Sequence, residues 1–286
     1  MTVRLWIPLP SPDESIASIL WRAACFLEID PNVLWGHIVS DVPGDPGTMD
    51  APSSNALRRI ANGIGMTPSR LAAHRIPVGE TLLEPNARTA ACPLCWQEDD
   101  VNGRPRTYRR AWAYACRTFC RQHRVPLVAP RRPGHLDLSA NTHDYARLSG
   151  AEHETIVQMI DFEDRIAAVL DGAEQWPIEW AGSASGFKVA LAQLVSENAA
   201  TGGRPLVCNI YVSRALEPYI HGPKHYGSLR NSERWLAFLR ERNPAVRRAA
   251  LWLATVYVSP ERATDHASGL PARLLQKIFS ADQILD

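Results

Sequence analysis

Cys92-Pro-Leu-Cys95 and Cys120-Arg-Gln-His123 are the two short segments that decide how the middle of this chain folds. Each segment places two soft ligands on one tight turn, so each pair can hold one edge of a tetrahedron. Pro93 stiffens the first turn. We therefore expect Cys92, Cys95, Cys120 and His123 to bind one structural Zn²⁺ ion, in a site without an open position for catalysis.

Two other interpretations of these cysteines are open. A Cys-x-x-Cys pair can be a redox dithiol, but such a pair is expected beside a βαβ unit, and the surrounding sequence shows none. Cysteines can also be buried as small hydrophobic residues. Cys116 lies four residues before Cys120 and could replace it as a ligand. The two-residue spacing to His123 favours Cys120, and we interpret Cys116 as a core residue.

The segment from Val101 to Leu136 contains no Asp or Glu but nine arginines, with Tyr and Trp residues between them. Guanidinium groups bind phosphate and flat aromatic side chains stack on bases, so we expect a surface for nucleic acid or an acidic partner. The alternatives are a solvated basic face and pairing with acidic residues elsewhere in the chain. The predicted nucleic-acid contacts are Arg104, Arg106, Arg109, Arg110, Arg117, Arg121, Arg124, Arg131 and Arg132, together with Ser69 and Arg70.

The N-terminal region predicts helices. Ser11-Pro-Asp-Glu14 has the pattern of a capping box with Ser11 as the N-cap of the first helix. Residues 53–71 have the pattern of a helix-turn-helix, because Gly65 permits a turn and Thr67 can cap a second helix that starts at Pro68. A plain helical hairpin that reads no DNA explains the same pattern. His74, where such motifs usually have an apolar residue, weakens the match.

The whole sequence predicts a mainly α protein. We expect an N-terminal helix-turn-helix-like domain over residues 1–86, a zinc-binding, Arg-rich module over 87–136 and a C-terminal helical domain over 137–286. Apolar residues at helical spacing or breaks at proline indicate helices near 153–170, 187–198, 231–242, 244–257 and 270–280.

The composition and the missing motifs exclude several classes of protein. The net charge of +1 gives no global sign of nucleic-acid binding. No apolar run is long enough to span a bilayer and no secretory signal opens the chain, so we expect a cytoplasmic protein without membrane contact. No Gly-rich phosphate loop, His-Glu-x-x-His or Gly-x-Ser-x-Gly motif occurs, and catalysis is not expected.

Four motifs, in order along the chain, resemble the TniQ family. They cover about residues 8–128, whereas residues 186–286 match nothing that we can assign. The motifs are Pro10-x-Pro-x-Glu-Ser-Ile-x-Ser-Ile-Leu-x-Arg22, then Leu57-x-x-Ile-Ala-x-Gly-Ile-Gly-Met-Thr-Pro-x-x-Leu71, then Cys92-Pro-x-Cys95-x-x-x-Asp99, and finally Arg109, Trp112 and Cys120-x-x-His123-x-x-x-Leu127.

The resemblance implies a non-catalytic accessory protein of DNA transposition, with helix-turn-helix domains and zinc-finger motifs. Family members are similar to target-site selectors that bring a transposase, through its AAA+ ATPase, to chosen DNA. In CRISPR-associated transposons they dock on the RNA-guided effector complex, often as a dimer. The resemblance also supports the four zinc ligands. Many members carry a second Cys-Pro-x-Cys after the position of Leu127, but here Val128-Ala-Pro-Arg-Arg-Pro-Gly-His135 follows, so a second zinc site is not expected.

Three hypotheses about function follow. The first is an adaptor that links a transposon ATPase and transposase to target DNA or to an RNA-guided complex, with homodimer formation as a family expectation. The second is a sequence-specific DNA-binding regulator that reads its target with residues near Ser69, Arg70 and His74. The third is a zinc-dependent hydrolase, which would need an open position on the metal.

Overall fold

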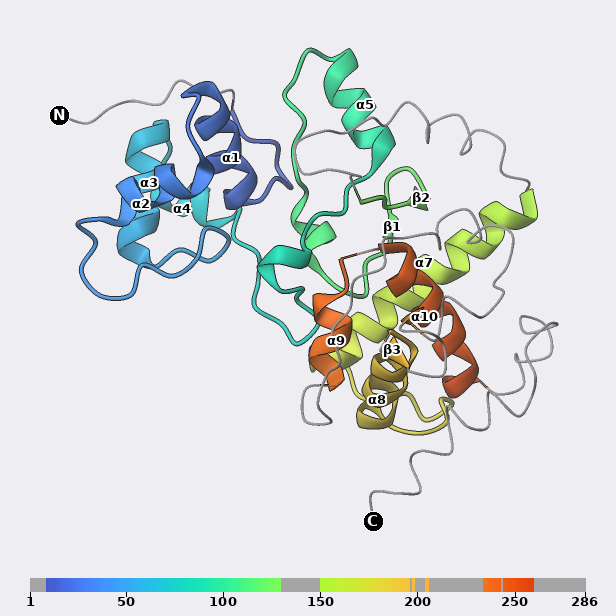
Figure 1. The fold of residues 1–286 in the computed structure, drawn as a ribbon. Helices are drawn as coiled ribbons and strands as arrows, with labels where there is room; N and C mark the ends of the chain where they lie inside the picture. Colours follow the sequence, from blue (N-terminus) through green and yellow to red (C-terminus); the bar gives the residue numbers. More distant parts are fainter. Residues whose placement is uncertain are drawn as a thin grey trace. The chain divides into compact units, whose positions relative to one another are not determined.

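The computed structural model describes residues 9–129, 150–195, 197–198, 204–205, 234–242 and 244–259, and these are mainly helical as predicted (Figure 1). Contacts divide the chain into two compact units: residues 1–78 with 94–113, and residues 79–93 with 114–286. Two of the unit boundaries fall within residues 87–136, the range of the expected zinc-binding module. Compact units are not independently folding domains, so the three-domain division stays a prediction.

Four helices form the core of the first unit: α1 (Ile16–Phe26), α2 (Pro31–Val39), α3 (Ser54–Ile64) and α4 (Pro68–Ala72). α1 packs on α2, α2 on α3 and α3 on α4. Their apolar faces share one cluster of buried side chains, because residues three and four apart on each helix point the same way. This cluster includes Ile16, Ile19, Leu20, Leu34, Leu57, Ile60, Met66 and Leu71.

The start of α1 differs from the prediction. The side chain of Glu14 accepts a hydrogen bond from the Ser11 N–H at 3.1 Å, as in a capping box, but the helix begins four residues later than predicted. Ser15 is the N-cap, and its side chain accepts from the Ser18 N–H. The reason is that Glu14 also binds two side chains of α1, Ser18 and Arg22, and so lies beside the helix rather than within it.

The predicted hairpin over residues 53–71 is confirmed. Ser53 caps α3, Gly65 ends it with φ of 73°, and the side chain of Thr67 caps α4. Gly65 is required here because the left-handed conformation is strained for residues that carry a Cβ. α4 has only five residues, which is short for a recognition helix.

The first unit is completed by α5 (Pro93–Val101) and the 3₁₀ helix η2 (Arg110–Ala113). Trp96 of α5 is fully buried, and its Nε1 donates a hydrogen bond to the Thr107 carbonyl at 2.9 Å. The rings of Tyr108 and Trp112 meet the ring of Trp96 edge-on, with centroids 5.2 and 6.4 Å away. Trp96 and Trp112 are buried, and the partly buried Tyr108 packs its ring against both, so Trp112 does not present an open face for stacking on bases.

The second unit contains the 3₁₀ helix η1 (Pro85–Ala87), the helices α7 (Gly150–Leu170), α8 (Ala184–Val195), α9 (Arg234–Arg240) and α10 (Pro244–Val258), and two strand pairs. The pairs are antiparallel, β1 (Phe119–Cys120) with β2 (Val125–Pro126) and β3 (Glu197–Asn198) with β4 (Arg204–Pro205). α8 packs on both α9 and α10 (Figure 1). The helix predicted at 270–280 lies outside the described residues.

Candidate metal centre and basic segment

The β1–β2 hairpin presents two of the predicted metal ligands. Cys120 pairs with Val125, and His123 lies in the turn between the strands. The turn is closed by a hydrogen bond of 2.8 Å from the Arg124 N–H to the Cys120 carbonyl. Arg124 has φ of 53°, a left-handed conformation that is uncommon outside glycine. The hairpin therefore points a thiol and an imidazole to the same side.

The other two predicted ligands, Cys92 and Cys95, lie at the start of α5. Ala91 and Val128 exchange two backbone hydrogen bonds of 2.9 Å, which places Cys92 beside the hairpin. Helix α5 begins immediately afterwards at Pro93, so Cys95 lies in its first turn. A proline is well suited to this first helical position.

The four side chains predicted as ligands lie together. One ligand atom from each of Cys92, Cys95, Cys120 and His123 can be chosen so that all lie within 4.8 Å of one another. The Nδ1 of His123 is 3.5 Å from the Sγ of Cys92 and 3.8 Å from the Sγ of Cys120. Metal–ligand bonds of about 2.3 and 2.1 Å give a tetrahedral S–N edge of roughly 3.6 Å. The arrangement therefore fits a tetrahedral metal ion.

Two helices of the second unit hold the hairpin in place. Glu163 of α7 is fully buried and accepts hydrogen bonds from the backbone N–H and the hydroxyl of Thr118. Arg248 of α10 is also buried, and its Nη1 donates to the carbonyls of Thr118 at 2.8 Å and Leu127 at 3.3 Å. These bonds fix the residues on both sides of the strand pair, and with them Cys120.

The electrostatics of this buried region are unusual. Burial raises the pKa of Glu163 from 4.5 to about 7, although the Thr118 hydrogen bonds and the nearby guanidinium groups of Arg117 and Arg248 oppose the shift. Burial likewise lowers the pKa of Arg247 to about 10, so this side chain still carries its charge at neutral pH. Burial also raises the pKa of the Cys116 thiol. Cys116 belongs to the core cluster of the second unit, as predicted.

A second buried polar cluster lies at the start of α1. The carboxylate of Glu14 accepts from Ser18 at 2.9 Å and forms a two-pronged ion pair with Arg22, with bonds of 2.8 and 2.9 Å. The same segment bonds with the backbone of Tyr108 twice: the Ser15 N–H donates to the Tyr108 carbonyl, and the Tyr108 N–H donates to the Ser18 side-chain hydroxyl. This cluster therefore ties the segment before η2 to α1.

His74 is part of the same cluster. Only 6% of its surface is exposed, and its Nδ1 lies 2.9 Å from the Glu14 carbonyl. A side chain in this position cannot reach the edge of a base. This contact explains why position 74 carries a polar residue where helix-turn-helix motifs usually have an apolar one.

Comparison with known protein families gives a match over residues 5–127, to the TniQ family. This part of the chain is similar to TniQ proteins. No curated protein matches the chain. The match implies a transposition-associated accessory protein.

The TniQ motif residues mostly have structural roles in this chain. Glu14 and Arg22 form the buried ion pair of α1. Asp99 is fully buried and accepts hydrogen bonds from the N–H and the hydroxyl of Thr107. Arg109 binds the carboxylates of Asp13 at 2.7 Å and Asp99 at 3.5 Å. The motif thus encodes contacts between the N-terminal helices and the segment that follows α5.

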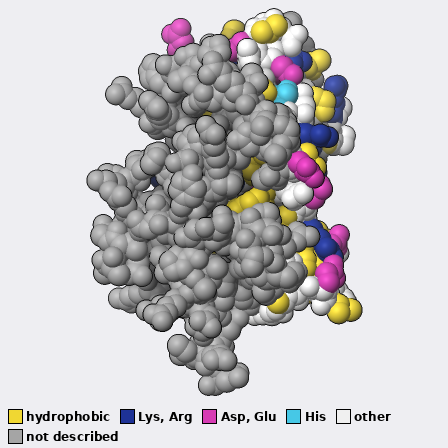
Figure 2. Space-filling model, turned by 90° about the vertical axis from the view of Figure 1, so that its right-hand side faces the viewer, with side chains coloured by type: hydrophobic (Ala, Val, Ile, Leu, Met, Phe, Trp, Pro, Cys, Tyr) yellow, Lys and Arg dark blue, Asp and Glu magenta, His cyan; other side chains and the backbone are white. Residues whose placement is uncertain are grey.

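Carboxylates from outside the acid-free segment pair with many of its arginines. Besides Arg109, ion pairs join Arg104 to Asp99 at 3.4 Å and Arg106 to Asp100 at 2.6 Å. Arg117 and Arg121 both contact Asp164 of α7. Figure 2 shows the same mixture on one face of the molecule, where basic and acidic side chains of the described residues neighbour each other. Pairing within the chain, one of the two alternatives, accounts for these five.

The remaining predicted contacts fall into three groups. Arg110 donates to the backbone carbonyl of Ala73 at 2.5 Å, which is a structural contact. Ser69, Arg70 and Arg124 are exposed. Arg131 and Arg132 lie outside the described residues.

Sequence reasoning missed the two residues that hold the hairpin. Glu163 stands in the polar segment Asp161-Phe162-Glu163-Asp164, yet it lies four residues after Met159 and three before Ile166, on the buried face of α7. Arg247 and Arg248 are adjacent in α10, a helix in which most other residues are apolar. A charged residue inside an apolar stripe was the signal that could have found both.

Proposed function

We propose that this chain is a non-catalytic adaptor of DNA transposition in the cytoplasm, which recruits a transposase and its AAA+ ATPase to target DNA. The observation that carries the proposal is the TniQ match over residues 5–127, together with a four-ligand metal cluster. Four protein ligands fill a tetrahedral ion, so the metal shapes the fold and activates no water. Recruitment through an RNA-guided effector complex and assembly as a homodimer belong to the same proposal.

We propose Zn²⁺ as the ion in this site. Three thiolates and one imidazole are the donor set of structural zinc sites. When bound, the ion joins the start of α5 to the β1–β2 hairpin and so adds to the free energy of folding. The chain's own residues position the donors, through Pro93 on one side and the Thr118 contacts on the other.

Direct contact with DNA is proposed for the exposed residues among the predicted set. Ser69 and Arg70 begin α4, and Arg124 lies at the tip of the metal-bearing hairpin. Arginines that are ion-paired within the chain contribute less, because a phosphate would have to displace a carboxylate that is already in place. A few phosphate contacts suit an adaptor that depends on partners for its affinity.

Co-purification tests the proposal. The tagged chain is expressed together with its neighbouring genes, and we expect an AAA+ ATPase among their products to co-purify and transposition to require the chain. His123→Ala should weaken both through loss of the metal-bound fold, whereas Cys25→Ser at an exposed thiol should weaken neither. Recovery of neither partner, combined with tight binding of the isolated chain to one DNA sequence, would replace the adaptor with a regulator.

A further inference from the structure

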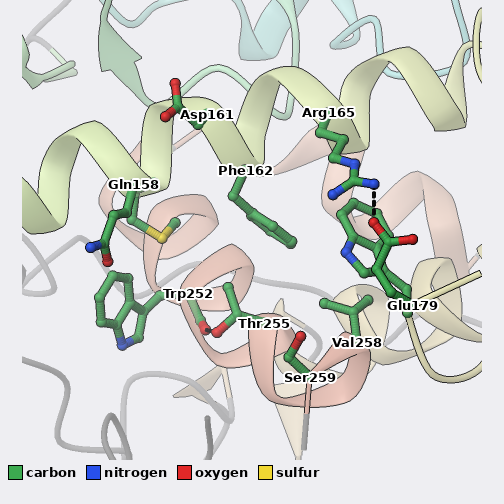
Figure 3. Close-up of a pocket in the computed structure, with 11 residues that line it drawn as sticks. Gln158, Asp161, Phe162, Arg165, Glu179, Trp252, Thr255, Val258 and Ser259 are labelled. Carbon is green, nitrogen blue, oxygen red and sulfur yellow. Dashed lines mark hydrogen bonds and ion pairs between the residues drawn. The ribbon is translucent and has the colours of Figure 1, made fainter. Parts of the chain in front are cut away.

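A cleft in the second unit lies between α7, α10 and the segment that carries Glu179 and Trp180 (Figure 3). Its volume is about 430 Å³. The positions that line it on α7, and likewise those on α10, follow one another about one helical turn apart, so they lie on one face of each helix. The lining residues are Gln158, Met159, Asp161, Phe162, Arg165, Glu179, Trp180, Trp252, Thr255, Val258 and Ser259.

The floor of the cleft is aromatic. Phe162 points into its centre, with Trp252 toward one end and the Arg165–Glu179 pair at the other (Figure 3). The Phe162 ring lies 5.8 Å from the ring of Trp180, so these side chains hold each other in place. A volume of about 430 Å³ lies within the range of sites that take small molecules or side chains of a partner, roughly 300–1,000 Å³.

The cleft already holds one cation. The guanidinium of Arg165 lies 4.9 Å from the centroid of the Trp180 ring and is ion-paired with Glu179. Aromatic faces and carboxylates attract the same kind of group, a cation on a side chain with an apolar stem. A carboxylate offers about four acceptor positions, so Glu179 can bind a second donor while it keeps Arg165.

The charged side chains among the described residues of the cleft are more acidic than basic. Two of these lining residues, Asp161 and Glu179, are acidic and one, Arg165, is basic, and Asp161 points away from Phe162 (Figure 3). The last turn of the 15-residue helix α10 also lines the cleft, at Thr255 and Val258. A helix C-terminus carries a partial negative charge. Stacked bases would bring phosphates to this negative rim, so the charges favour a basic peptide over a nucleic acid.

We infer that this cleft binds a basic segment of a partner protein. An Arg or Lys side chain of the partner lies between Glu179 and the C-terminal turn of α10. An adjacent apolar side chain of the partner covers Phe162 and Trp252. The inference concerns a peptide-binding surface of the second unit and does not depend on the proposed role in transposition.

Nuclear magnetic resonance of the full chain tests this surface with three small probes: N-acetyl-Phe-Arg-amide, N-acetyl-Phe-Glu-amide and the dinucleotide TpT. The indole N–H signals of Trp180 and Trp252 are assigned with Trp→Phe variants. We expect both signals to shift with the Arg probe, at up to about 5-fold lower concentration than with the Glu probe, as for one partly exposed charge pair.

The matched variants are Glu179→Lys and Glu174→Lys. Both positions are exposed and five residues apart, but only Glu179 lines the cleft. Glu179→Lys should remove the preference for the Arg probe, and Glu174→Lys should keep it. The inference is overturned if neither indole signal shifts up to 20 mM Arg probe, which is about the weakest affinity of interest. It is also overturned if the two peptides bind equally or if TpT binds more tightly than the Arg probe. Indole signals that shift with protein concentration alone would indicate contact between copies of the chain and would likewise overturn it.

Discussion

Glu163→Gln is the most informative single substitution for the metal-bearing hairpin. The amide keeps a carbonyl oxygen that can accept the two hydrogen bonds from Thr118. It cannot ionise, so it removes only the charge. Wild type and variant should therefore differ in how their stability depends on pH and retain the same fold.

The sign follows from the raised pKa of Glu163, which is about 7 in the folded chain and 4.5 for an ordinary Glu. The protonated form is favoured by folding, so the stabilisation is complete below pH 4.5 and is lost as the pH rises through about 7. The total amounts to about 3 kcal/mol, at about 1.4 kcal/mol per pKa unit. About 2 kcal/mol of this falls between pH 5.5 and pH 8.0.

Thermal unfolding across this pH range measures the effect as the difference between the two proteins. Protonation of the four proposed metal ligands also changes stability, but it is common to both proteins and cancels. We expect the melting temperature of wild type to fall relative to that of Glu163→Gln by about 4–8 °C from pH 5.5 to 8.0. Glu154→Gln, at an exposed position of the same helix, should run parallel to wild type. A constant difference between wild type and Glu163→Gln would refute the reasoning, because Glu163 would then stay ionised throughout.

Three further predictions concern the metal, the buried ion pair and DNA. Cys92→Ser should reduce bound zinc well below one ion per chain in native mass spectrometry and lower the melting temperature, whereas Cys25→Ser should change neither; a fully zinc-loaded Cys92→Ser protein would remove Cys92 from the site. Arg22→Met should destabilise the chain by about 3–5 kcal/mol in denaturant unfolding, because it leaves a buried carboxylate uncompensated, and adding Glu14→Gln should recover part of the loss; no recovery would argue against the pair. Arg124→Gly should leave the melting temperature nearly unchanged, because relief of the left-handed backbone offsets the added freedom of the unfolded chain. The same substitution should reduce the slope of log K for DNA binding against log salt concentration by about one. An unchanged slope would remove Arg124 from the DNA-binding surface.

Local patterns in the sequence predicted much of the fold. Gly65, Thr67 and Pro68 act within a few residues of one another, and a turn of this kind is determined by those residues alone. The metal cluster was also predictable, because Cys-x-x-Cys and Cys-x-x-His each fix a pair of donors locally. In both cases the residues that determine the local structure lie within a few positions of one another in the sequence.

Long-range polar contacts were not predictable in the same way. Glu14 satisfies the capping pattern with Ser11, yet its bonds to Ser18 and Arg22 set where α1 begins. Thr118 is 45 residues from Glu163 and 130 from Arg248. Nothing in the neighbouring sequence of either residue names its partner, so only the fold reveals which buried charges are compensated.

The arginine-rich segment shows why local charge in a sequence differs from charge on a surface. Nine arginines in a stretch without Asp or Glu predict a strong positive field if the stretch folds by itself. The folded chain brings Asp13 from before the segment and Asp164 from after it to three of these arginines. An ion-paired arginine can reach a phosphate only by giving up its carboxylate, so the exposed side chain of Arg124 has the smaller barrier to DNA contact. Binding measured across salt should therefore report few released counterions, far fewer than nine, and a slope close to nine would show that the internal pairs open when DNA arrives.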